Sequence, residues 1–111
     1  MPWHARHRFA RISPRKARLV AELIRQRDVQ DALNVLRFTH NRAAQMMTKV
    51  LNSAIANADE AEADVDRLFV QEARVDEGPR MRRFRPKDRG RAHMIRKPTS
   101  HITVVVDQEQ E

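Results

Sequence analysis

Apolar residues recur at helical spacing in three segments before residue 59. The first segment follows Ser13 and Pro14, which suit an N-cap and the first position of a helix, because proline needs no N–H there and its φ is already helical. The second follows Asp28, which can also cap a helix. The apolar stripes predicted for these two helices are Leu19, Val20, Leu23 and Ile24, and Val29, Ala32, Leu33 and Leu36.

The third segment predicts the central helix of the fold. Thr39 or Asn41 can cap it, and more than half of its circumference is apolar, so we expect it to be buried. The acidic residues 59–66 then predict a solvated loop. The stripe of this helix is Ala44, Met47, Leu51, Ala54, Ile55 and Ala58, widened by Ala43, Met46 and Val50.

Alternating and β-branched residues replace the helical pattern after residue 66. Residues 68–75 and 102–106 predict two strands of one hairpin with a long insert, and residues 5–12 predict a third strand at an edge. We therefore expect an α+β fold in which three helices pack on a three-stranded antiparallel sheet, with a long protruding β-hairpin. At this length the chain makes one domain, residues 1–111.

Composition narrows the functional classes. Hydrophobic residues make up 41% of the chain, which is enough for a core. No apolar run exceeds three residues, which excludes a transmembrane helix or signal peptide, so we expect a soluble intracellular protein with no membrane contact. The absence of cysteine excludes disulfides, thiolate metal sites and cysteine nucleophiles, and two glycines exclude most phosphate-binding glycine loops. We expect no enzyme, no cofactor and no metal.

The formal charge of +7 is unevenly distributed. Residues 1–18 carry six basic side chains and no acid, and residues 78–97 carry nine basic side chains against one acid, Asp88. Residues 19–77 carry eleven acids against seven bases, and residues 98–111 carry three acids and no base. Such basic segments attract polyanions.

The second basic segment cannot bury itself, because residues 79–97 hold few apolar side chains. If the two flanking strands continue into it, they make an arm roughly 30 Å long at about 3.3 Å per residue. An isolated two-stranded ribbon is marginal in water, so the arm needs a partner. The closely spaced cations favour a nucleic acid, which would accept Phe84 and Met94 in grooves or on base faces.

The first predicted helix points to the same ligand. Arg15, Lys16 and Arg18 lie in its first turns, where the helix dipole disfavours cations by about 0.3–1 kcal/mol each. A phosphate bound at this helix N-terminus would offset that cost, so the sequence predicts a phosphate site there.

Motifs for sequence-specific readout and for catalysis are missing. The sequence has no tyrosine, GxxG loop, zinc knuckle or HExxH motif, and the third helix offers only Arg42 and Lys49 for DNA recognition. His4 and His7 would face opposite sides of a strand, which argues against a metal site. His93 and His101 lie near the cations and are interpreted as hydrogen-bonding or stacking partners of nucleic acid.

Six blocks of sequence match a known family in order: residues 13–20 (SPRKARLV), 50–58 (VLNSAIANA), 75–79 (VDEGP), 85–86 (RP), 89–92 (RGRA) and 99–106 (TSHITVVV). The chain resembles the bacterial large-subunit ribosomal protein twenty-two family over nearly its whole length. The resemblance implies an assembly protein whose body binds large-subunit ribosomal RNA (rRNA), with a hairpin at about residues 75–102 that lines the nascent-peptide exit tunnel. It also implies a cytoplasmic, ribosomal protein, monomeric when free, whose partners are rRNA, neighbouring ribosomal proteins and the nascent peptide.

The charge pattern and this resemblance together indicate the candidate RNA-binding residues. They are Arg6, Arg8, Arg11, Ser13, Arg15, Lys16, Arg18, Arg80, Arg82, Arg83, Arg85, Lys87, Arg89, Arg91, His93, Arg96, Lys97, Thr99 and His101. The resemblance places the tip of the hairpin in the tunnel wall, and that tip comprises Met81, Arg82, Arg83, Phe84, Arg85, Pro86, Lys87, Asp88, Arg89, Gly90 and Arg91. Asp88 and Pro98 depart from the family pattern, in which a small or basic residue and a basic residue are usual.

Two other functions are compatible with the sequence. A free nucleic-acid chaperone or nucleoid-type protein would use the same charge without a fixed site, and co-sedimentation with the large subunit at high salt separates it from a ribosomal protein. A small nuclease is supported only by His4, His7, His93 and His101, and activity with added metal in a nuclease assay would favour it.

Overall fold

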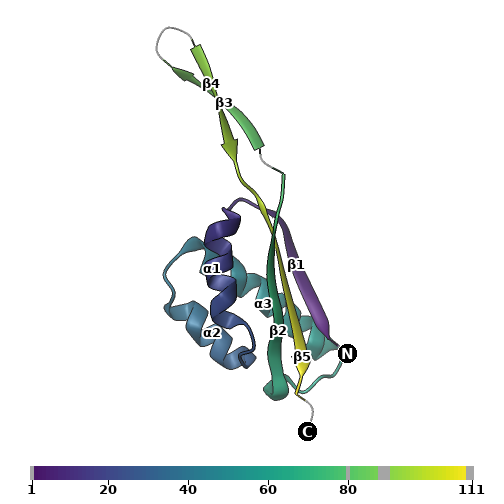
Figure 1. Cartoon of the computed structure of the whole chain (residues 1–111). Coiled ribbons are helices and arrows are strands. Elements are labelled where there is room, and N and C mark those ends of the chain that lie inside the picture. The colour runs from purple at the N-terminus through teal and green to yellow at the C-terminus, as the bar shows by residue number, and fades with distance from the viewer. Residues whose placement is uncertain (1, 80, 88–90, 110–111) are drawn as a thin grey trace.

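The computed structural model describes residues 2–79, 81–87 and 91–109, and for 81–87 and 91–97 it describes the backbone alone. Three helices cover one face of a three-stranded sheet, and a two-stranded ribbon projects from one end of this body (Figure 1). The predicted α+β fold is confirmed. The elements in chain order are β1 (Trp3–Ala10), α1 (Pro14–Ile24), α2 (Val29–Phe38), α3 (Arg42–Glu60), the 3-10 turn η1 (Val65–Arg67), β2 (Leu68–Glu77), β3 (Met81–Lys87), β4 (Arg91–Lys97) and β5 (Ser100–Gln108).

Strand β5 is the centre of the sheet, whose order is β1-β5-β2 with antiparallel pairing throughout. The expected hairpin with a long insert is therefore β2 and β5, and β1 is the expected edge strand. Ile102, Val104 and Val106 are fully buried under the helices, while His101, Thr103 and Val105 alternate with them on the other face. β1 runs two residues short of the predicted end at Ile12, because the chain turns after Ala10 toward α1.

Helix α3 is the central helix, as predicted. Met47, Leu51 and Ala54 are fully buried against β1 and β5, and the Asn41 side chain caps the helix by accepting a hydrogen bond from the Ala44 N–H at 2.7 Å. The predicted loop at residues 59–66 is wrong at its start, because α3 continues to Glu60. Glu62 then ends it with a left-handed φ of 64°, and the Ala63 N–H bonds back to the Ala58 carbonyl.

Two details of α1 differ from the prediction. The buried face is Ala17, Val20, Ala21 and Ile24, whereas Leu19 and Leu23 are 64% and 41% exposed. The small side chains of Ala17 and Ala21 allow α1 to approach the sheet closely. The helix face that carries them is therefore buried, and Leu19 and Leu23 lie at the side of the helix. Ser13 and Asp28 occupy the N-cap positions of α1 and α2, but neither side chain makes a capping hydrogen bond.

Helix α1 also covers the free edge of β2. Arg18 Nε donates to the Val75 carbonyl at 3.2 Å, and Arg25 Nε donates to the Ala73 carbonyl at 3.0 Å. Beyond them, the Gln26 N–H donates to the Val70 carbonyl, and the Val70 N–H donates to the Arg27 carbonyl, both at 2.8 Å. These bonds satisfy backbone groups that an edge strand would otherwise expose for pairing with another chain.

The ribbon of β3 and β4 forms a second sheet, with a continuous register from Met81 opposite Lys97 to Lys87 opposite Arg91. It gives the molecule an extent of 67 × 25 × 17 Å and a radius of gyration of 17.1 Å. A compact domain of this length would have a radius of gyration near 13 Å. The arm expected from the sequence is thus present as a projection from the body.

We predict that the amides of β3 and β4 exchange with solvent far faster than those of β2 and β5 in the free protein. A two-stranded ribbon without a covering layer is marginally stable, whereas β5 is paired on both sides and covered by helices. Residue-level hydrogen exchange measures this difference. Protection of residues 81–87 and 91–97 equal to that of Val104 would contradict it.

Candidate nucleic-acid interface

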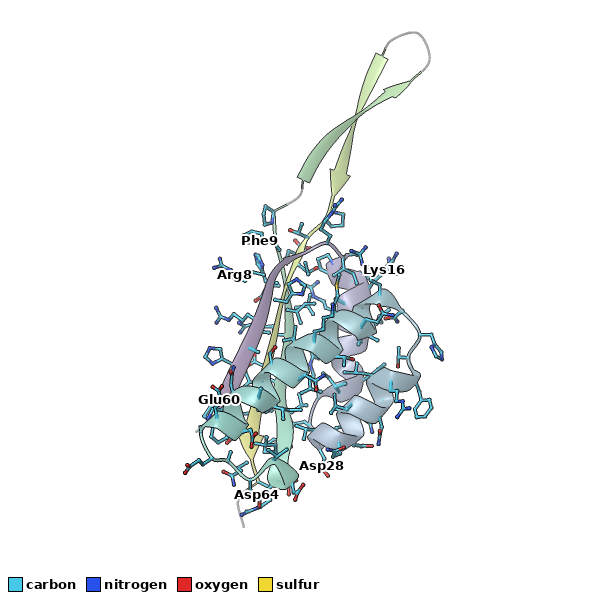
Figure 2. The ribbon with its side chains drawn as sticks, turned by 180° about the vertical axis from the view of Figure 1, so that it is seen from behind. Arg8, Phe9, Lys16, Asp28, Glu60 and Asp64 are labelled. Atoms are coloured by element: carbon cyan, nitrogen blue, oxygen red, sulfur yellow. The ribbon has the colours of Figure 1, made fainter. Side chains whose placement is uncertain are left out.

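Charge is divided along the long axis of the molecule. Figure 2 shows Arg8 and Lys16 near the end from which the hairpin leaves, and Asp28, Glu60 and Asp64 at the opposite end of the body. The same acidic end holds Asp59, in the last turn of α3, and Glu62, just after the C-cap Ala61. A polyanion is therefore attracted to the hairpin end and repelled from the other.

A groove with a volume of about 690 Å³ lies at the basic end. It brings together the segment between β1 and α1, the first turn of α1, the start of α3 and Pro98 next to β5. Three cations border it, and the lining residues within the described part of the chain include no acid. The lining consists of Arg11, Ile12, Ser13, Lys16, Leu19, Asn41, Arg42, Ala43 and Pro98.

Two helices begin at this groove. The first turns of α1 and α3 contain no acidic residue, and the N-terminal end of each helix carries a partial positive charge. Lys16 and Arg42 therefore stand beside helix ends that repel them, which weakens folding slightly unless an anion binds. Backbone N–H groups and cations that meet in one groove are suited to phosphate oxygens.

A second groove of about 620 Å³ adjoins the first, with Asn41 and Arg42 lining both. It adds six further polar or basic residues from α2, α3 and the segment between them: Arg37, Thr39, His40, Gln45, Thr48 and Lys49. The sequence prediction missed Arg42 and Lys49 as candidates because it treated the third helix as core, and it missed Arg37 and His40 because they lie outside the two basic segments. The available signal was the spacing of Arg42 and Lys49, which puts them seven residues apart and on one helix face.

The uncovered face of the sheet carries mixed charge. Arg6 and Arg74 flank Thr103 on the two neighbouring strands. Arg74 is paired with Glu72 at 3.2 Å and Asp76 at 3.1 Å, so it contributes little net positive charge. The basic character of this face therefore comes from Arg6 and Arg8 of β1, at the strand's exposed positions.

The structure gives several of the predicted residues a defined place. Arg6, Arg8, Arg11, Arg15 and Lys16 are exposed at or near the basic end. Arg18 is exposed, but its Nε holds β2, so it has a structural contact in addition to any RNA contact. Ser13 is half-buried in the groove. Thr99 is only 2% exposed and its hydroxyl donates to the Pro79 carbonyl, so it closes the base of the hairpin instead of facing outward.

The remaining candidates lie in the hairpin. Arg80, Asp88, Arg89 and Gly90 lie outside the described residues. For the others the structure gives the strand position and no side-chain placement: Met81, Arg82, Arg83, Phe84, Arg85, Pro86 and Lys87 are on β3, and Arg91, His93, Arg96 and Lys97 are on β4.

A β-bulge interrupts β1 next to the base of the hairpin. His7 pairs with Ile102 and Ala10 with Ser100, so Arg8 and Phe9 stand opposite the single residue His101. Phe9 adopts a φ of 58°, a conformation that costs a non-glycine residue about 1–2 kcal/mol. Its N–H donates to His101 Nδ1 at 3.1 Å, and the two rings meet edge to face with centroids 4.8 Å apart. His101, predicted as an RNA contact, thus also fixes the bulge.

Metal and membrane sites are not found in the described part of the chain. Within it, no cluster of three or more His, Cys, Asp or Glu side chains is arranged to hold a metal ion. His4 is exposed and His7 is half-buried, as expected for opposite faces of β1. None of the described helices combines the length and apolar character needed to cross a membrane.

Comparison with known proteins settles the family. Residues 5–107 match the family described as ribosomal protein L22p/L17e. The chain belongs to this family. It is a family of ribosomal structural proteins and not of enzymes, which confirms the expectation that the chain has no catalytic function and removes the nuclease alternative.

Curated bacterial relatives match over nearly their full length. The chain is 53% identical over 107 residues to the large ribosomal subunit protein uL22 of Geobacter metallireducens, covering 96% of this chain and 97% of the relative. It is 51% identical to that of Syntrophotalea carbinolica, covering 95% and 96%. It is 54% identical to that of Desulfitobacterium hafniense, covering 94% and 92%.

Proposed function

We propose that this protein is a structural component of the large ribosomal subunit in the cytoplasm, and that it binds large-subunit rRNA through its basic end and its hairpin. The observation that carries the proposal is the convergence of distant segments on one acid-free groove. Arg11, Lys16 and Arg42 come from three separate parts of the chain and border it together. Family membership supports large-subunit rRNA as the polyanion, since the relatives are named as large ribosomal subunit proteins.

The groove suits the backbone of RNA. Phosphates follow one another at short intervals along a strand, and a second groove with Arg37, His40 and Lys49 continues from the first through Arg42. Contacts of this kind fix position and orientation without reading sequence. A protein that uses them needs a preformed RNA fold to recognise, which is the situation of a subunit assembly protein.

The hairpin supports the finer part of the proposal, in which its tip lines the exit tunnel and meets the nascent peptide. A ribbon of two strands is narrow enough to enter between RNA helices, and its nine basic residues within residues 80–97 would neutralise phosphates along the way. The body stays at the subunit surface beside neighbouring ribosomal proteins. We also propose that the free protein is a monomer. A free nucleic-acid chaperone would use the same charges without a fixed site, and co-sedimentation with the large subunit at high salt is the experiment that separates the two.

We predict that Lys16→Ala weakens binding to protein-free large-subunit rRNA without loss of fold stability. Removing one phosphate contact should lower affinity several-fold and reduce the log-log salt slope by about 0.7–0.9. The melting temperature should stay the same or rise slightly, because a cation leaves the positive end of α1.

Arg25→Ala is the matched control, because it also removes one cation, at the C-cap of α1. Arg25 donates to the Ala73 carbonyl, so its loss should reduce stability by about 0.5–1.5 kcal/mol while the salt slope stays unchanged. Binding isotherms at several salt concentrations and thermal melts decide the matter. If Lys16→Ala lowers the melting temperature and leaves affinity intact, Lys16 is structural and the groove is not the RNA site.

A second prediction separates anchoring from tunnel lining by the hairpin, and it uses residues at the start of β3, where Met81 pairs with Lys97. Deletion of Met81, Arg82 and Arg83 should leave incorporation into subunits largely intact. The body keeps its basic end, and the hairpin keeps most of its basic residues. An odd deletion shifts the register of β3 against β4 and exchanges the faces of the following residues. Sensitivity of translation to tunnel-binding inhibitors should therefore change.

The double substitution Arg82→Ala with Arg83→Ala is the control for this deletion, since it removes both charges and keeps the register. It should leave inhibitor sensitivity close to that of the parent. Quantitative mass spectrometry of purified subunits measures incorporation. Loss of the deleted protein from subunits, with normal inhibitor sensitivity where it is retained, would show that the hairpin is an anchor instead.

A further inference from the structure

Phe9 is an exposed aromatic ring at the end of the body from which the hairpin leaves (Figure 2). Phe9 is 54% exposed, although the next residue, Ala10, is 1% exposed and belongs to the core. In a regular pleat Phe9 would continue the partly buried series of Trp3, Ala5 and His7, and Ala10 would be exposed. The bulge directs the ring outward, which is a recurrent use of bulges near functional sites.

The surrounding residues hold the ring in this position. His101 accepts the Phe9 N–H and packs edge to face with the ring at an interplanar angle of 85°. Space for His101 depends in turn on Gly78, where a Cβ would lie 3.3 Å from His101 Nε2 and 2.5 Å from Thr99 Oγ1. Residues of β1 and β5 and Gly78 after β2 therefore hold one apolar ring exposed to solvent. The left-handed backbone of Phe9 is strained, and the packing of the core does not require that strain.

The chemistry around the ring matches one unpaired nucleotide. The Arg8 guanidinium carbon lies 5.5 Å from the centre of the Phe9 ring, so a cation and an aromatic face are adjacent. A flat ring accepts a nucleobase by stacking, and a guanidinium accepts the neighbouring phosphate. Across the sheet, Asp76 lies opposite His101 and is already bound by Arg74 at 3.1 Å. An RNA base fits this setting better than an apolar protein surface does, because burial under protein would strand the Arg8 charge.

We propose that Phe9 is a stacking site for an unpaired base of the bound RNA, with Arg8 contacting the adjacent phosphate. The inference rests on the proposed RNA binding and adds to it a contact with a base, where the groove supplies contacts with phosphates. It assigns a function to the strained bulge, which the packing of the body does not explain.

The test compares Phe9→Leu, which removes the aromatic face, with Phe9→Tyr, which keeps it. Binding to protein-free large-subunit rRNA should weaken about 5- to 100-fold for Phe9→Leu, the usual effect of losing one stacked base, with an unchanged salt slope. Phe9→Tyr should bind within about two-fold of the parent on the same scale. Chemical probing of the complex should show one unpaired base that is protected by the parent and by Phe9→Tyr, and is reactive with Phe9→Leu.

Phe38→Leu is the matched control, because Phe38 is a second exposed phenylalanine, 77% exposed at the end of α2. It should bind as the parent does. Phe9→Gly guards against misfolding, since glycine adopts a φ of 58° without strain; it should remain folded by circular dichroism and lose affinity as Phe9→Leu does.

The outcomes separate this inference from the proposed function. If Phe9→Leu and Phe9→Gly bind with parental affinity while Lys16→Ala binds weakly, the stacking site is wrong and the RNA-binding groove stands. If affinity falls but no base changes reactivity, the loss does not come from a stacked base and the inference is also wrong. If the parent protein itself shows no specific binding to large-subunit rRNA, the proposed function fails with it.

Discussion

The rest of the structure depends on the pairing of β2 with β5, which is made inside the body and is continued by the ribbon of β3 and β4. Their register runs from Leu68 opposite Gln108 to Glu77 opposite Ser100, so the two chains leave the body already aligned. The Gly78 N–H then donates to the Thr99 carbonyl at 2.9 Å, and the buried Ser100 hydroxyl donates to the Ile12 carbonyl at 2.7 Å. The two-stranded ribbon is marginally stable alone, and these hydrogen bonds at its base set the direction in which it leaves the body.

The same base brings the candidate RNA contacts together. Ile12, whose carbonyl accepts the Ser100 hydroxyl, belongs to the segment that leads into α1 and lines the main groove, while Pro98 lines that groove from the hairpin side. Cations at the positive ends of α1 and α3, and a phenylalanine with a left-handed backbone at the same end of the body, each reduce the stability of the free protein a little. Their concentration at one end of the molecule is explained by a polyanionic ligand that reverses the cost, and packing within the body does not explain it.

Much of the fold follows from the sequence because local and tertiary signals agree. The stripe of α3, the Pro14 start of α1 and the β-branched run in β5 all predicted the observed elements. Leu19 and Leu23 were misplaced because spacing alone cannot choose between two adjacent apolar rows; the close approach permitted by Ala17 and Ala21 decides it. Asn41 makes a capping hydrogen bond and Ser13 does not. Both residue types are good N-caps, so the sequence alone could not predict this difference in side-chain geometry. The site was less predictable, since Arg42 joins Arg11 and Lys16 only through tertiary packing, and the bulge at Phe9 is a property of strand register.

The most direct test of this account asks which end of the body faces RNA. The chain contains no cysteine, so single cysteines introduced as Gln45→Cys, beside the grooves, and Glu60→Cys, at the acidic end, can each carry a tethered iron chelate that cleaves nearby RNA. In reconstituted complexes with large-subunit rRNA, the probe at position 45 should give strong localised cleavage, and the probe at position 60 little or none. Equal cleavage from both positions, or stronger cleavage from position 60, would contradict the assignment of the basic end as the RNA-binding surface.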